Sequence, residues 1–147
     1  MSIAGRIEIA SIPADQVPAL VAALRSALER ARASEVSSTG NLVVFRAGLA
    51  RMVSNLNVLV PVGSGVVEIQ AGSPGGVAFR CSCVQLLVVI SVMALFVAAL
   101  IPGTQPPLVK FGVPLVMWLW LFGANFVIAS FRLPAFFRRA VRDAEAA

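Results

Sequence analysis

The chain has 147 residues, a mean hydropathy of +0.89, 13% charged residues and a net charge of +5. Histidine is absent, which removes the commonest ligand of zinc and haem and the usual acid–base group near neutral pH. Two cysteines are too few for a disulfide framework or an iron–sulfur cluster. We therefore expect a protein that is not an enzyme, with no catalytic residues, cofactor or metal site.

The first 80 residues predict a small α+β domain. Residues 6–10 alternate polar and apolar side chains, as a half-buried strand does, and residues 17–31 carry one apolar stripe at helical spacing. Strand-like stretches follow at 35–46, where a break is expected near Gly40 and Asn41, and at 58–62, 66–71 and 77–80. We interpret the order as β-α-β-β-β and leave open one further strand that the break would create. It predicts a mainly antiparallel sheet with one covering helix.

Two long apolar runs dominate residues 81–132, and Lys110 is the only charged residue from 81 to 131. Each run, 83–101 and 111–131, is about 30 Å long as a helix, which matches the hydrocarbon core of a bilayer. Backbone groups inside lipid must bond within their own segment, which favours helices. The sequence therefore predicts a transmembrane hairpin of two helices.

Residues 133–147 predict a third element. Pro134 can begin a helix, and the apolar side chains that follow fall on one side of it, opposite a basic side. We expect a short amphipathic helix in the head-group region of the bilayer, with a frayed polar tail as the alternative. Four arginines would bind anionic lipid head groups or set the topology: Arg132, Arg138, Arg139 and Arg142.

The distribution of cations also predicts an orientation. Arg80 precedes the first apolar run and four arginines follow the second, whereas the connecting loop carries Lys110. The positive-inside rule then predicts an inner-membrane protein with two spans and both termini in the cytoplasm. The arginines of residues 1–80 are dispersed among five acidic residues, which disfavours a nucleic-acid partner.

Cys81 and Cys83 lie where the last strand is expected to enter the first membrane helix. One such pair cannot complete a four-ligand metal site within a chain that lacks histidine. We interpret the two cysteines as small, fairly apolar residues at the membrane interface. Metal binding between chains and acylation are the alternatives.

Small residues mark one face of each predicted membrane helix. Ser91, Ala94 and Ala98 lie on one face of the first helix, and Gly112, Gly123 and Ser130 lie close to one line on the second. Small side chains let two helix backbones approach closely. We therefore expect these two faces to meet and to close the hairpin.

A different face of the second helix carries Trp118, Phe122 and Asn125. An unpaired amide within an apolar run is costly in lipid. If the small residues close the hairpin, this face points outward, and we expect it to bind a partner helix. The alternative is that Asn125 pairs with Gln85 inside the hairpin and that the tryptophans face lipid.

These patterns favour a non-catalytic accessory or assembly subunit of a larger inner-membrane complex, for example a respiratory or photosynthetic one. Its partners would be other integral membrane subunits and the lipid bilayer. A membrane-anchored sensor or adaptor for a soluble partner is one alternative. A small homo-oligomeric transport component is another, although the apolar runs offer few of the polar groups that a conduction pathway usually needs.

Overall fold

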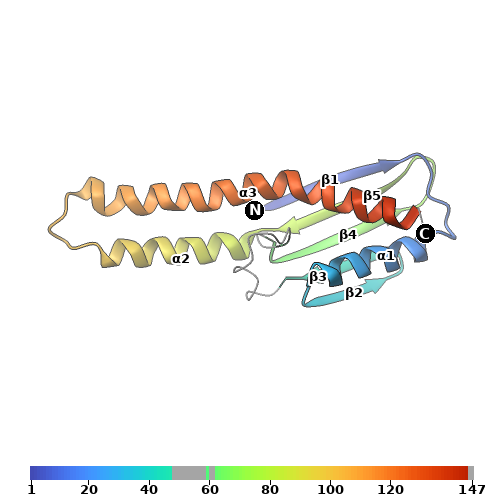
Figure 1. Ribbon diagram of the computed structural model, residues 1–147, viewed down its shortest axis with the longest axis horizontal. Helices are drawn as coiled ribbons and strands as arrows, with labels where there is room; N and C mark the ends of the chain where they lie inside the picture. The colour runs from blue at the N-terminus through green and yellow to red at the C-terminus, as the bar shows by residue number, and fades with distance from the viewer. Residues whose placement is uncertain (48–58, 60–61, 146–147) are drawn as a thin grey trace.

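The computed structural model describes residues 1–47, 59 and 62–145. In chain order the elements are β1 (Ser2–Ile9), α1 (Val17–Arg30), β2 (Glu35–Thr39), β3 (Leu42–Arg46), β4 (Ser64–Gln70), β5 (Gly75–Ser82), α2 (Val84–Leu100) and α3 (Pro107–Glu145). The sheet and α1 lie at one end of an elongated molecule, α2 lies at the other, and α3 runs along both (Figure 1).

The five strands form one antiparallel sheet in the order β1-β5-β4-β3-β2. The expected α+β class is therefore confirmed, and the strand break left open is the turn between β2 and β3. That turn places Gly40 at a φ of +60°, a conformation that glycine adopts without the steric cost of a Cβ. The expected strand at 58–62 lies largely outside the described residues, and β4 begins at Ser64.

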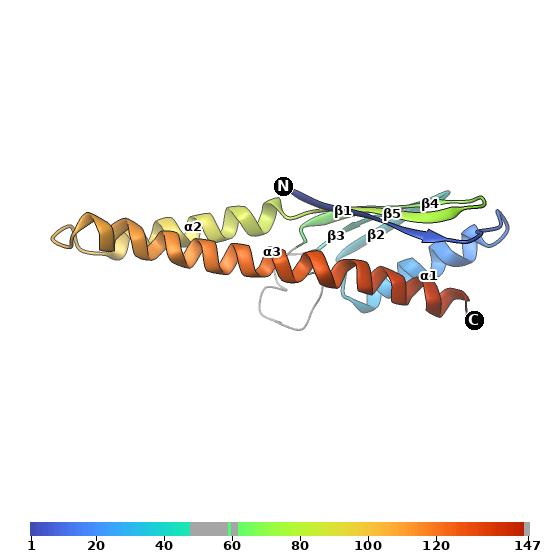
Figure 2. The same cartoon turned by 90° about the horizontal axis from the view of Figure 1, so that it is seen from above.

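Two helices, rather than the one expected, cover the same face of the sheet. Figure 2 shows the sheet as one layer, with α1 and the C-terminal part of α3 as the other. On the β5 side, the ring of Phe79 lies 4.9 Å from the ring of Phe137 in α3. Gly5, opposite Phe79 in the sheet, leaves room for that ring, because a Cβ there would lie 2.5 Å from its Cζ atom. The helical layer is therefore part of the domain core.

The third element is a correction to the sequence analysis, because α3 is one continuous helix of 39 residues that passes through Pro134. Proline inside a helix removes one backbone hydrogen bond and tends to bend or end the helix. Here Leu133 and Phe137, on either side of it, are both 0% exposed in the domain core. The expected boundary at 132 and the separate amphipathic helix of 133–147 at the membrane surface are therefore wrong.

One stripe of buried side chains runs along α3 and has two partners. Its N-terminal part, which includes Phe122, packs with Leu86 and Ile90 of α2. Its C-terminal part packs in the domain core: Ala129, Leu133, Phe137, Ala140 and Val141. Phe126 packs against both clusters. The same face of α3 therefore joins the apolar helices to the sheet.

Within the described residues, α3 is the helix that is both long and apolar enough to cross a membrane. The other apolar helix, α2, has 17 residues and lies beside the first half of α3 in both views (Figures 1 and 2). The structure thus supports one candidate span by length and composition, where the sequence analysis expected a hairpin of two.

The substitution Phe137→Ala tests the role of α3 in the domain core. Removing a fully buried ring that packs on Phe79 should lower the free energy of unfolding by about 3–5 kcal/mol. Phe131→Ala is the matched control, because that ring is on the same helix and is 75% exposed. It should change the free energy of unfolding by less than about 1 kcal/mol. Denaturant unfolding in detergent micelles, followed by circular dichroism, measures both, and equal effects would contradict the packing of α3 on the sheet.

Candidate functional site

The first candidate surface is the face of α3 that carries Trp118 and Phe122, and it is turned inward against α2. The indole Nε1 of Trp118 donates a hydrogen bond to Ser91 Oγ of α2, at 3.0 Å. Phe122 is 5% exposed and packs with Leu86 and Ile90. The expectation that Trp118 and Phe122 point outward is therefore wrong.

Three aromatic side chains stack in sequence along this inward face. The rings of Trp118 and Phe122 lie 5.2 Å apart and those of Phe122 and Phe126 lie 6.0 Å apart, and both pairs are stacked. Such pairs add about 0.5–1.5 kcal/mol beyond the area that they bury. The contact between α2 and α3 thus rests on large rings packed against aliphatic side chains, whereas the sequence analysis expected close approach of small residues.

The small residues of α3 lie on its other side. A Cβ added at Gly112 or at Gly123 would meet nothing within 4 Å, so neither glycine is needed for contact with α2. Large apolar side chains of α3 are exposed as well, among them Leu119 at 56% and Trp120 at 74%. The expected assignment of the two faces of α3 is therefore reversed.

Asn125 satisfies part of its hydrogen-bonding capacity within its own helix. Its Nδ2 donates to the carbonyl oxygen of Leu121 at 2.6 Å, and the residue is half-buried. The alternative pairing with Gln85 is not the contact found, since the side chain of Gln85 lies over Gly63, where a Cβ would come within 2.8 Å of Oε1. A bond to the carbonyl four residues earlier lowers the cost of an amide in an apolar helix.

Cys81 and Cys83 are both 0% exposed and belong to the domain core, at the point where β5 passes into α2. Burial, and to a lesser extent the neighbouring Cys83 thiol, raise the pKa of the Cys81 thiol to about 12. Metals and electrophiles react with the thiolate, which is scarce at neutral pH under these conditions. Within the part of the chain that the structure describes, no group of three or more metal-ligating side chains comes together.

The four arginines expected at the lipid head groups are spread around α3, and all four are exposed. Arg132 lies just beyond the apolar run. Arg139 lines a hollow between α1 and α3 that also contains Arg30 and Asp143. Arg138 and Arg142 lie on a different side, where they line a groove between α3 and β1. The four arginines therefore do not form one row along α3.

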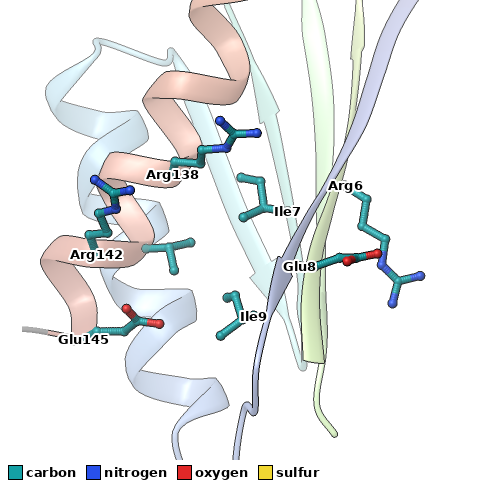
Figure 3. Close-up of a pocket in the computed structure, with 8 residues that line it drawn as sticks. Arg6, Ile7, Glu8, Ile9, Arg138, Arg142 and Glu145 are labelled. Atoms are coloured by element: carbon teal, nitrogen blue, oxygen red, sulfur yellow. The ribbon is translucent and has the colours of Figure 1, made fainter. Parts of the chain in front are cut away.

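The groove between β1 and α3 has a volume of about 650 Å³ and was not anticipated from the sequence. Figure 3 shows Arg138 and Arg142 on its α3 side and Ile7 and Ile9 of β1 facing them. Glu145 closes its end. The sequence did contain one signal for it, because the apolar spacing of α3 continues without interruption from Phe122 through Ala129 to Phe137, which indicates one helix instead of two.

Comparisons of this chain with protein-family models, with curated proteins and with solved structures give no match. Function therefore has to be inferred from the surfaces themselves. Among the surfaces of the described residues are the outward apolar face of α2 and α3, the open face of the sheet, and the groove beside β1.

The hydrogen bond between Trp118 and Ser91 can be tested by a double-mutant cycle. We expect Trp118→Phe and Ser91→Ala to be coupled by about 0.6 kcal/mol, and by no more than about 1.7 kcal/mol, as is found for hydrogen bonds between membrane helices. Trp120→Phe combined with Ser91→Ala is the control and should show no coupling, because Trp120 is exposed. Unfolding in mixed detergent micelles measures the cycle. Coupling of Ser91 to Trp120 instead of Trp118 would contradict the inward position of Trp118.

Proposed function

We propose that this protein is a non-catalytic accessory or assembly subunit of a larger complex in the inner membrane, and that its partners are other integral membrane proteins. The observation that carries the proposal is the outward apolar face of α2 and of the first half of α3. Large side chains on it are exposed, including Leu95 at 71%, Phe96 at 63% and Trp120 at 74%. A contiguous apolar surface of this extent requires lipid or protein to cover it.

Both α2 and α3 cross the bilayer in this proposal. The 17 residues of α2 span about 25 Å, and Cys83 and Ile101 at its two ends extend the apolar stretch. A span slightly shorter than the hydrocarbon core is accommodated by local thinning of the bilayer at a modest cost. Arg80 and Arg132 then flank the two spans on the cytoplasmic side, and Lys110 lies outside.

The proposed contact with partner helices is the glycine-bearing face of α3. Trp118 and Phe122 are occupied by α2, which leaves Gly112 and Gly123 on the outward side together with exposed aliphatic residues. Glycine on an outward face lets a second helix approach closely, and packing of this kind drives association where lipid offers no hydrophobic gain. The face therefore suits an α-helical membrane partner.

The small domain is joined to the apolar helices through α3 itself, which supports a role in assembly. Since α3 continues from the apolar half into the domain core without a linker, a partner bound to the apolar half fixes the position of the sheet as well. A sensor or adaptor would instead be expected to use the domain alone, with the apolar helices as a simple anchor.

Purification of the native complex in mild detergent tests the proposal. We expect a defined set of integral membrane subunits to accompany the protein, and Gly123→Leu to reduce their recovery at least tenfold. Gly103→Leu is the matched control, because Gly103 lies in the loop between α2 and α3 and a Cβ there also meets nothing within 4 Å. It should leave recovery unchanged.

Three results would contradict this function. Recovery of a soluble protein alone would favour the sensor or adaptor. A homo-oligomer without other subunits would favour the transport component. Equal recovery from both glycine variants, with each variant inserted and monodisperse, would show that the glycine face of α3 is not the contact.

A further inference from the structure

The strand β1 forms an open edge of the sheet beside the α3 groove. It has eight residues and pairs on one side with β5, and it is one of the two edge strands of the described sheet, with β2 at the other edge. An open edge strand of this length presents a row of free backbone donors and acceptors to which another extended chain can add. Figures 1 and 2 show α3 running beside β1, so that an added strand would lie next to the helix as well.

The hydrogen-bond register identifies the backbone groups that face this edge. In an antiparallel ladder, pairs that exchange hydrogen bonds alternate with pairs that do not. Cys83 N donates to the carbonyl oxygen of Met1 at 3.1 Å, and these two residues continue the register in which Ile3 pairs with Cys81. Odd-numbered residues of β1 therefore bond to β5, and the N–H and C=O groups of Ala4, Arg6 and Glu8 point to the open edge.

The side chains near this edge specify what can add to it. Ile7 and Ile9 face α3 and form an apolar floor, whereas the side chains of Arg6 and Glu8 point to the opposite face of the sheet (Figure 3). On the α3 side the groove is lined by Arg138 and Arg142, with Glu145 at its end. Arg138 and Arg142 lie one helical turn apart, which separates them by about 6 Å along the helix. Alternate side chains of an extended peptide are spaced by about 6.6 Å, so acidic side chains at every second position match the two guanidinium groups.

We infer that the β1 edge and the α3 groove together form a docking site for an extended acidic segment of a partner protein, which adds as a sixth strand with carboxylates directed to Arg138 and Arg142. Guanidinium groups bind carboxylates through paired hydrogen bonds. A small anion would satisfy the arginines but would leave the row of backbone groups beside them open. A peptide satisfies both.

Lipid head groups and a second copy of this chain fit the site less well than an acidic peptide. The comparison rests on the proposed function, in which α2 and α3 cross a bilayer. Arg138 and Arg142 lie six and ten residues beyond Arg132 on a continuous helix, about 9 and 15 Å further from the bilayer, which disfavours lipid head groups. Antiparallel pairing of β1 with a second copy would direct the apolar helices of the two copies in opposite directions, which is incompatible with one membrane.

A titration of the purified full-length protein in detergent micelles tests the site. The probe is a fluorescent eight-residue peptide of alternating glutamate and valine, and the control peptide has lysine in place of glutamate. We expect the glutamate peptide to bind at least tenfold more tightly than the lysine peptide. Joint replacement by Arg138→Gln and Arg142→Gln should weaken its binding at least tenfold, whereas Arg139→Gln, on another side of α3, should leave it within twofold.

A second pair of variants tests strand addition separately from charge. Glu8→Pro removes an N–H that faces the open edge, and proline is tolerated at such a position of an edge strand. It should weaken binding of the glutamate peptide at least tenfold relative to Glu8→Thr, which keeps the N–H.

Three results would overturn the inference. One is equal binding of the glutamate peptide to both variants at residue 8, and another is equal binding of the two peptides. The third is a homodimer that Glu8→Pro abolishes, because it would assign the edge to a second copy. The titration uses the isolated chain, so the docking site and the proposed membrane role can fail independently.

Discussion

The burial of one stripe of α3 against two different surfaces is the constraint on which the rest of the structure depends. Leu86 and Ile90 of α2 cover the N-terminal part of the stripe, and the sheet and α1 cover the C-terminal part. Phe126 packs with both groups. The helix therefore cannot rotate about its axis without losing both contacts at once, and burial of each large side chain is worth about 1.5–3 kcal/mol. The inward position of Trp118 and the outward position of Gly123 both follow from this fixed rotation.

The fold class could be inferred from the sequence, because the alternation of β1 and the apolar spacing of α1 are local signals with a direct physical cause. The position of β1 next to β5 could not, since strand order depends on contacts between residues far apart in the chain. The continuity of α3 across residues 132–134 was missed because Pro134 and the charges after it were given more weight than the uninterrupted spacing of Leu133, Phe137 and Val141. A proline can lie within a helix when packing on both sides holds it there.

The faces of the apolar helices were misassigned for a related reason. Small residues were expected to meet each other, and one residue of α2 that contacts α3, Ser91, is indeed small. On α3, however, aromatic side chains fill the space opposite it, because Trp118 both stacks on Phe122 and donates to Ser91. The spacing of residues in the sequence cannot decide whether the small face of α2 packs on the small face of α3 or on its aromatic face. Consequently the outward surface proposed for partners is the glycine face of α3. The groove beside β1 could not be inferred from the sequence, because it forms where residues 133–145 pack on the sheet.

The central claim is that α3 is one continuous helix from the apolar half into the domain. A distance between two spin labels, measured by pulsed electron–electron double resonance, tests it most directly. Labels at Leu119 and Arg142, both exposed, are introduced in a chain that carries Cys81→Ala and Cys83→Ala. A continuous helix places their Cα atoms about 35 Å apart, from 23 residues at 1.5 Å each. A distance distribution centred near that value supports one helix that spans the apolar half and the domain. A distribution centred at about 25 Å, expected for a right-angle bend at Pro134, would contradict it. Such a result would support the separate helix on the membrane surface that the sequence predicted.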